Sequence, residues 1–289
     1  MDHNRSTANS TSAGEAWLGT LIQSLNSTQL SPLGEQLPAF PTEELQRNTT
    51  GLSSEAALRQ AYAFYENVTD AAARIGLPLD RNTRALDFGF GWGRISRVFM
   101  QHLSVHNIHG LDVDPWFVDI TRDLFKSDQF QACAPFPPSA HADASFDLIY
   151  SYSVFSHLSE AACQAWMQEF ARLLKPGGMV AFTTRHETFF DFCAWAKTQD
   201  ASVSPYIAAL GQLFPDLDAA REAYRQGRIV HASSAGVGGG GPRDESFYGE
   251  TWIPEQYARS QFGDQFEFVA GYFDGGKYDQ ACFALKRKG

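Results

Sequence analysis

The 289-residue sequence lacks the features that define several protein classes. No apolar run approaches the ~20 residues that a membrane-spanning helix requires. The N-terminal stretch is polar and rich in Ser, Thr and Asn, unlike a secretory signal. The four cysteines lie far apart and form no CxxC pair, which argues against a disulfide framework or a zinc site. These absences predict a cytoplasmic, soluble protein without a bound metal or membrane partner.

Basic residues are also in deficit. The formal net charge is −10, and Lys and Arg are scattered, with one tight cluster at Lys286–Lys288 that we interpret as a solvated end. Proteins that bind nucleic acid usually carry a basic stripe, so the charge pattern argues against a nucleic-acid partner. A small molecule, or a glycan without dense negative charge, fits this balance better as a ligand. The oligomeric state is not predicted by these patterns.

Hydrophobic periodicity divides the chain into three parts. Residues 1–15 are polar and without apolar periodicity, so we expect a disordered tail. Residues 16–80 are expected to form an N-terminal arm, extended where prolines interrupt it, followed by a helix from Ser54 to Ile75. We expect this part to act as a lid. Residues 81–289 are expected to form the main domain, with a helical and glycine-rich insertion at 188–250.

The helix of the N-terminal part carries three aromatic residues, Tyr62, Phe64 and Tyr65. They would either close over a ligand or pack in the core, and an aromatic helix face is more often core. Tyr248 and Trp252 follow the glycine run of the insertion and are weaker candidates for pocket walls.

The main part alternates short apolar runs with amphipathic helices. This pattern is typical of a parallel sheet that helices cover on both faces. The first five runs are residues 84–88, 107–113, 129–133, 146–151 and 179–184. The last two runs, near residues 266–272 and 281–286, have no crossover helix between them and should pair antiparallel. The predicted fold class is therefore α/β, with a doubly wound, mostly parallel sheet.

A glycine-rich turn follows the first predicted strand, in the segment Asp87–Gly93 (DFGFGWG). Glycines at alternate positions let the backbone turn sharply and let a ligand approach closely. Ligands of such sheets bind beyond the carboxyl ends of the strands. Asp112, 21 residues after Gly91 at the end of the next strand, is placed to bind both hydroxyls of a ribose.

The turn distinguishes between two classes of cofactor. Its spacing is GxGxG rather than the GxGxxG of dinucleotide-binding enzymes. The acid Asp87, directly before Phe88 and the first glycine, would repel a pyrophosphate but suits a ligand with an ammonium group and a sulfonium. These two features favour S-adenosylmethionine over NAD.

Four blocks of the sequence, in order and spacing, resemble the class I S-adenosylmethionine-dependent methyltransferases. The blocks are Leu86–Arg94, Gly110–Pro115, Phe146–Leu158 and Leu173–Gly178. The resemblance covers roughly residues 84–185. It implies a seven-stranded sheet with strand order 3-2-1-4-5-7-6, in which strand seven is antiparallel, and S-adenosyl-L-methionine as the cofactor.

The resemblance also implies which residues hold the cofactor. They are Asp87, Phe88, Gly89, Gly91, Asp112, Val113, Ser151 and Tyr152. Asp87 would act on the amino group of the cofactor, directly or through water, and Asp112 would bind the ribose. Many members carry an acid after strand three that binds adenine, but residues 131–134 read Gln-Ala-Cys-Ala here. That contact is therefore expected to differ.

Two histidines are candidate catalytic residues. His157, shortly after the fourth strand, is either a general base for the methyl acceptor or a helix-entry residue bonded to backbone. His186, just beyond the fifth strand, lies where acceptors approach and is open between the same roles. The expected reaction is methylation of an oxygen by in-line displacement. The alternatives are a non-catalytic cofactor-binding module of a biosynthetic complex and an NAD-dependent oxidoreductase.

Overall fold

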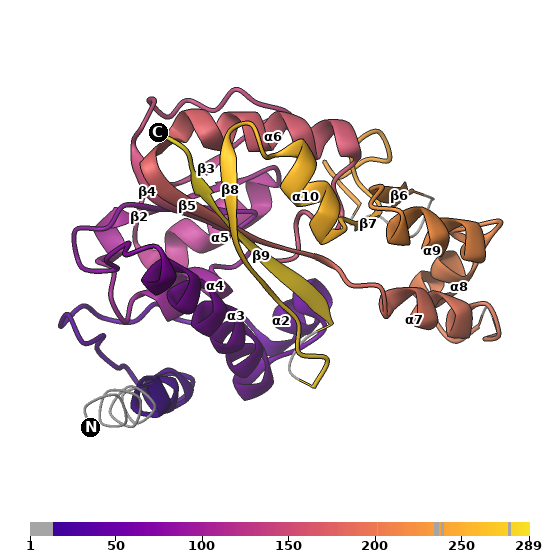
Figure 1. Ribbon diagram of the computed structural model, residues 1–289. Helices are drawn as coiled ribbons and strands as arrows, with labels where there is room; N and C mark the ends of the chain where they lie inside the picture. Colours follow the sequence, from indigo (N-terminus) through magenta and orange to yellow (C-terminus); the bar gives the residue numbers. More distant parts are fainter. Residues whose placement is uncertain (1–13, 201, 234–236, 238–239, 277–278) are drawn as a thin grey trace, which may run out of the picture.

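A computed structural model describes residues 14–289 except 201, 234–236, 238–239 and 277–278 (Figure 1). Residues 1–13 of the expected disordered tail lie outside the described residues. Among the described residues, no helix has the length and apolar character needed to cross a membrane. The same residues hold no group of three or more His, Cys, Asp or Glu side chains that could bind a metal ion.

A seven-stranded sheet forms the centre of the molecule, in the order β3-β2-β1-β4-β5-β9-β8. The strands are β1 (Ala85–Phe88), β2 (Ile108–Asp112), β3 (Phe130–Ala132), β4 (Phe146–Ser151), β5 (Leu174–Arg185), β8 (Phe266–Tyr272) and β9 (Gln280–Arg287). The first five are parallel to one another, and β9 is antiparallel to both β5 and β8. Counted in chain order within this sheet, the arrangement is 3-2-1-4-5-7-6, as the sequence predicted.

Successive residues of the central strands face opposite layers, because side chains alternate along a strand. Ala85 and Tyr150 belong to one buried cluster, whereas Leu86 and Ile149 belong to the other. The first layer contains α3 (Ser54–Arg74), α4 (Arg94–Phe99) and α5 (Pro115–Phe125), and the second contains α6 (Glu160–Leu173) and α10 (Glu255–Gln261). A short 3₁₀ helix, η1 (Val105–Asn107), precedes β2. Helices therefore cover both faces of the sheet (Figure 1).

The N-terminal segment has no helix over residues 31–42, which hold its three prolines, but it has helices on both sides of them that the expectation of an extended arm did not include. Residues 14–23 are helical, and α2 (Glu43–Thr50) follows with its N-cap at Thr42. Proline does not prevent short helices when it lies outside them. Trp17 Nε1 donates to the carbonyl of Val98 at 2.9 Å, which anchors this segment to α4.

The aromatic residues of α3 serve the core. Phe64 and Tyr65 are 1% and 3% exposed, and they meet Tyr152 and Phe99 edge-on with ring centroids 5.2 and 5.1 Å apart. Of the two alternatives for these side chains, the core position is the one that the structure shows.

The segment after β5 builds a smaller cluster beside the sheet. It contains α7 (Phe189–Ala196), α8 (Pro205–Gln212), α9 (Leu217–Arg225) and the antiparallel pair β6 (Val230–Ala232) and β7 (Glu250–Trp252). The buried Trp252 stacks on Phe190, with centroids 4.6 Å apart, and packs against Phe214. Backbone hydrogen bonds from Gly249 to His157 and from Thr251 to Ser156 join this cluster to the loop after β4. The cluster therefore lies next to the carboxyl ends of the parallel strands.

Candidate cofactor and acceptor site

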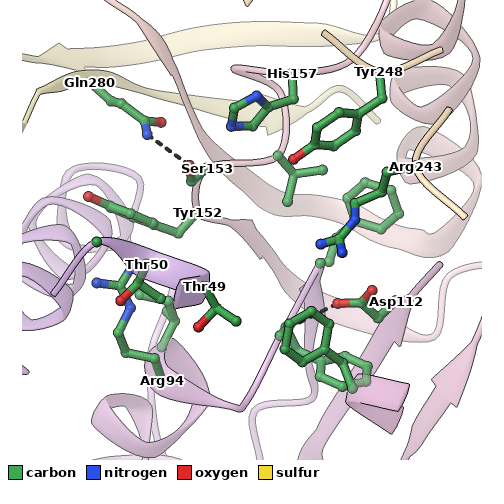
Figure 2. Close-up of a pocket in the computed structure, with 18 of the residues that line it drawn as sticks. Thr49, Thr50, Arg94, Asp112, Tyr152, Ser153, His157, Arg243, Tyr248 and Gln280 are labelled. Carbon is green, nitrogen blue, oxygen red and sulfur yellow. Dashed lines mark hydrogen bonds between the residues drawn. The ribbon is translucent and has the colours of Figure 1, made fainter. Parts of the chain in front are cut away.

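A cavity of ≈ 950 Å³ opens beyond the carboxyl ends of the parallel strands (Figure 2). The glycine turn after β1, the end of β2 and the residues directly after β4 form its floor. The end of α2 lines one side, and residues of the cluster after β5 line the other. The cavity lies where β1 has β2 on one side and β4 on the other, which is the position at which doubly wound sheets bind ligands. Its volume is in the range of small-molecule and cofactor sites.

The glycine turn has the conformation that its sequence requires. Gly89, Gly91 and Gly93 have φ values of +75°, +52° and +75°, a region that other residues rarely adopt. A Cβ added to Gly93 would lie 2.3 Å from Cε2 of Phe125, whereas one added to Gly91 would meet no protein atom within 4 Å. Gly93 therefore permits close packing, and Gly91 leaves space at the cavity. A cradle of this kind fits an elongated cofactor laid across the turn.

Asp112 is the carboxylate that the fold places at the cavity floor. Its Oδ2 accepts from the N–H of Gly91 at 3.0 Å, and its Oδ1 accepts from the N–H of Asp114 at 2.9 Å. Burial raises the pKa of Asp112, and the two backbone donors and Arg243 oppose that shift. Each oxygen keeps a further lone pair for a ligand hydroxyl. The neighbouring Val113 also lines the cavity.

Six of the eight residues that the resemblance implied for the cofactor lie in the cavity wall: Phe88, Gly89, Gly91, Asp112, Val113 and Tyr152. Asp87 and Ser151 are not among the described residues that line it. Asp87 is 1% exposed and its Oδ2 accepts from Ser96 Oγ at 2.7 Å. Burial raises its pKa to about 7. Ser151 Oγ donates to the carbonyl of Phe88 at 3.0 Å. Both side chains therefore make hydrogen bonds within the protein next to the glycine turn and do not face the cavity.

The two candidate histidines have different surroundings. His157 lines the cavity, and its Nδ1 lies 2.8 Å from the carbonyl of Gly249. A carbonyl only accepts, so the proton is on Nδ1 and Nε2 has a free lone pair. The ring stacks on Tyr248 with ring centroids 4.8 Å apart and an interplanar angle of 6°. Figure 2 shows the two side chains next to each other. Burial lowers the pKa of His157, while Glu250 opposes the shift.

His186 is not among the described residues of the cavity wall. It stacks on Phe273 with ring centroids 3.5 Å apart, and its Nδ1 lies 3.1 Å from Thr188 Oγ1. Of the two predicted pocket walls of the insertion, Tyr248 lines the cavity, whereas Trp252 is fully buried. The structure therefore brings one of the two histidines to the cavity.

A buried ionic cluster closes the cavity near His157, and the sequence interpretation missed it. Arg185 Nε lies 2.7 Å from Glu250 Oε2, and its Nη1 lies 3.0 Å from Asp279 Oδ2. The hydroxyl of Tyr206 donates to Glu250 Oε1 at 3.0 Å. All four residues line the cavity. Arg185 was detectable as the residue directly after the fifth predicted strand, but Glu250 and Tyr206 lie in the insertion and carry no local signal.

A second missed group lies at the other side of the turn. Arg94 closes the first motif block, and its Nη1 donates to Gln60 Oε1 of α3 at 2.6 Å. Thr49 and Thr50, at the end of α2, also line the cavity. The Arg94 Cζ lies 4.9 Å from the centroid of the Tyr152 ring, and Figure 2 shows both side chains away from Asp112.

Comparison with known proteins gave one family and a common fold. Residues 85–178 match the family model described as "Methyltransferase domain", in the region where the four sequence blocks predicted one. The search of curated proteins found no similar sequence.

Three solved structures illustrate the similarity. An S-adenosylmethionine-dependent methyltransferase from Clostridium acetobutylicum is 11% identical with a TM-score of 0.51, over 78% of this chain and 91% of that one. A methyltransferase from Mesorhizobium loti is 16% identical with a TM-score of 0.47, over 76% and 96%. Magnesium protoporphyrin IX methyltransferase from Synechocystis, with bound S-adenosylhomocysteine, is 13% identical with a TM-score of 0.47, over 79% and 86%. The first of these shows that the fold is shared.

Proposed function

Because residues 85–178 match a methyltransferase domain, we propose that the chain uses S-adenosylmethionine to methylate an oxygen atom of a small molecule or glycan held in the cavity. The observation that carries this proposal is the continuity of the cavity. One wall contains the glycine turn and Asp112, and the same space extends to His157 and the ionic cluster at Arg185. The cavity therefore has room for a methyl donor and a methyl acceptor to bind next to each other.

The donor is assigned to the floor of the cavity. We propose that Phe88, Gly89 and Gly91 contact its methionine part, while Asp112 and Val113 hold the ribose and Tyr152 covers the reacting end. The role of Asp87 and Ser151 is then to fix this floor, since their side chains bond to Ser96 Oγ and to the Phe88 carbonyl. S-adenosylmethionine supplies a methyl group activated by positive sulfur, so the protein's task is alignment in a dry pocket.

His157 is proposed as the general base. Its Nδ1–H is held by the Gly249 carbonyl and its ring by Tyr248, so Nε2 can take the proton of an acceptor hydroxyl as the oxygen attacks. Burial lowers its pKa, which keeps the imidazole neutral and able to accept a proton at pH 7. Glu250, 3.8 Å from Nδ1, would stabilise the imidazolium that forms. His186 does not line the cavity, so a substitution of His186 serves as the control for the His157 variant.

The arm and the insertion are proposed to complete the acceptor pocket. Residues 47–52 line the cavity from the N-terminal part, and Tyr206, Arg243 and Tyr248 line it from the insertion. In this proposal residues 16–80 act as the lid and residues 188–250 determine which acceptor fits. The four free cysteines suit the reducing cytoplasm, where we place the activity.

Calorimetric titration tests the donor assignment. We expect S-adenosylhomocysteine to bind the wild-type protein and NAD not to bind. Asp112→Ala should weaken S-adenosylhomocysteine binding about tenfold or more, because two ribose hydroxyls lose a charged acceptor. Asp119→Ala, an exposed acid on α5, is the matched control and should have no effect. NAD binding in place of S-adenosylhomocysteine would reject the proposal in favour of an oxidoreductase.

Methyl transfer from labelled S-adenosylmethionine, measured over a panel of hydroxylated small molecules and glycans, tests turnover. His157→Ala should lower the rate on an accepted substrate by about 10²- to 10⁴-fold, whereas His186→Ala should leave it near wild type. Full activity of His157→Ala would exclude the histidine base. A non-catalytic module would bind the cofactor but transfer no methyl group.

A further inference from the structure

Ser153, in the loop directly after β4, belongs to a chain of hydrogen bonds that leaves its own hydroxyl proton free. Its backbone N–H donates to Thr183 Oγ1 of β5 at 2.7 Å, and the Thr183 hydroxyl donates to Gln280 Oε1 of β9 at 2.7 Å. The Gln280 amide therefore turns its Nε2 toward Ser153 Oγ, to which it donates at 2.9 Å (Figure 2). Because the serine oxygen accepts in this chain, its O–H remains a donor for another group.

The proton of the Ser153 hydroxyl is available to a ligand in the cavity. Ser153 and Gln280 both line the cavity, whereas Thr183 is 1% exposed. Within the part of the chain that the structure describes, Ser153 Oγ makes no hydrogen bond besides the one from Gln280. A donor in this position suits a ligand atom that has a lone pair, because a polar group enclosed by a bound ligand needs a partner.

The backbone of Ser153 has a conformation that favours glycine. Its φ is +60°, in the left-handed region that glycine adopts freely and other residues adopt at a cost. Glycine would therefore fit this backbone better than serine does. What serine adds at this position is its hydroxyl group.

His157, four residues further along the same loop, has the opposite hydrogen-bonding role. Its proton is on Nδ1, which lies 2.8 Å from the Gly249 carbonyl, so Nε2 is an acceptor. Both His157 and Ser153 line the cavity. The loop therefore offers one donor, Ser153 Oγ–H, and one acceptor, His157 Nε2, to a ligand.

A neutral hydroxyl is the acceptor group that fits this pair. It has one proton and two lone pairs. It can therefore donate to His157 Nε2, accept from Ser153 Oγ and keep one lone pair for the methyl carbon. A neutral amine has a single lone pair, which cannot accept from Ser153 and attack carbon at the same time. A carboxylate has no proton to donate to His157 Nε2.

We propose that Ser153 and His157 together select a hydroxyl group as the methyl acceptor, with Ser153 donating to its oxygen and His157 accepting its proton. The proposal rests on the proposed function and narrows the acceptor to an alcohol or a phenol. The acceptor oxygen forms its bond to the methyl carbon with one lone pair, the carbon–sulfur bond breaks with its electrons going to sulfur, and the hydroxyl proton passes to His157 Nε2. Gln280 is a positioning residue, because it acts through Ser153.

Ser153→Gly tests the hydroxyl, because it removes that group from a backbone that glycine fits. We expect kcat/KM for methyl transfer to an accepted hydroxyl compound to fall about 10- to 100-fold. The melting temperature should stay within about 2 °C of the wild-type value. The affinity for S-adenosylhomocysteine, measured by calorimetry, should change less than about twofold.

A pair of matched acceptors tests the selection itself. The two compounds differ only in carrying a hydroxyl or an amine at the methylated position. The wild-type protein should prefer the hydroxyl compound about 100-fold or more in kcat/KM. Ser153→Gly should reduce that preference about tenfold, because the amine no longer meets a donor that it cannot satisfy.

Gln280→Glu tests the positioning role while Ser153 stays in place. A carboxylate has only acceptor oxygens, so it would accept from both Thr183 and Ser153 and turn the serine proton away from the cavity. We expect the same losses of rate and of preference as in Ser153→Gly, and that variant decides alone if the buried carboxylate prevents folding. Ser156→Ala is the matched control and should leave both quantities unchanged. Ser156 is a fully buried serine of the same loop, and its Oγ has no hydrogen-bond partner among the described residues.

The outcomes separate this inference from the proposed function. If the wild-type protein methylates hydroxyl compounds and Ser153→Gly keeps both the rate and the preference, the inference is wrong while the proposed function stands. A loss of S-adenosylhomocysteine affinity as large as the loss of rate would assign Ser153 to the donor and overturn the inference. Faster methylation of the amine by the wild-type protein would overturn it as well. If no compound is methylated, the proposed function fails and this inference with it.

Discussion

Removal of Glu250 should destabilise the protein strongly, because its carboxylate is the buried partner of Arg185. Glu250 is 0% exposed, and Arg185 Nε lies 2.7 Å from its Oε2. Burial by itself would lower the pKa of Arg185, but the attraction of Glu250, Tyr206 and Asp279 raises it, so the guanidinium stays charged. In Glu250→Ala the buried guanidinium of Arg185 keeps its ion pair with Asp279, but the Asp279 side chain is 56% exposed.

Breaking a buried pair from one side costs about 3–5 kcal/mol. At about 2–4 °C per kcal/mol for a chain of this size, the melting temperature should fall by roughly 6–20 °C. Urea unfolding followed by far-UV circular dichroism gives the free energy of unfolding, and a thermal scan gives the midpoint. The Tyr206 hydroxyl also loses its acceptor, but that residue is 38% exposed and can bond to water instead.

A double-mutant cycle separates lost pairing from lost packing. Arg185→Met combined with Glu250→Leu should recover most of the loss, because replacing both charges with apolar groups is often neutral. Arg225→Ala is the control. It breaks a pair with Glu187 at 2.6 Å whose side chains are 55% and 31% exposed, and it should cost less than about 1 kcal/mol. A loss below about 1 kcal/mol for Glu250→Ala, or strictly additive effects in the cycle, would refute the reasoning.

Two further predictions concern the glycine turn and the acid before it. Gly93→Ala should lower the free energy of unfolding, measured with urea, by about 2–4 kcal/mol, because the added Cβ would overlap the Phe125 ring and φ is +75°. Gly34→Ala is the control, since Gly34 has φ +80° but a Cβ there would meet no atom within 4 Å. An equally large loss in Gly34→Ala would contradict the overlap argument. Asp87 has a folded pKa of about 7, above its ordinary 3.8, so its ionisation opposes folding as the pH rises between those values. Asp87→Asn should therefore match the wild-type melting temperature near pH 4 and exceed it at pH 8, and an equal difference at both pH values would disprove the assignment.

The sheet could be predicted because its signals are local. Alternating apolar runs, crossover helices and the missing crossover between the last two strands lie in contiguous residues, and they predict a mostly parallel sheet that ends in an antiparallel pair. The strand order followed from the resemblance of the four sequence blocks to a known family. The glycine turn is local as well, since Gly89, Gly91 and Gly93 need their positive φ values whatever packs around them. Asp112 followed from the rule that ligands meet the carboxyl ends of parallel strands.

The direction of individual side chains was decided by packing. Asp87 and Phe88 are neighbours in β1, yet Asp87 accepts from Ser96 behind the turn while Phe88 reaches the cavity. His157 and His186 each follow a parallel strand, but only the loop of His157 is joined to Gly249 in a way that holds the ring at the cavity. No pattern in either segment distinguishes the two histidines, because their positions depend on residues almost a hundred apart in the chain.

The sequence by itself determined the parallel strands, the glycine turn and the carboxylate at its edge, because each is encoded within one strand and the turn that follows it. Only the tertiary structure brought Gln60 of α3 to Arg94, and Glu250 of the insertion to Arg185. Such pairs form where helices and loops from distant segments converge on the same sheet edge. Their charges became significant only once burial removed water from between them.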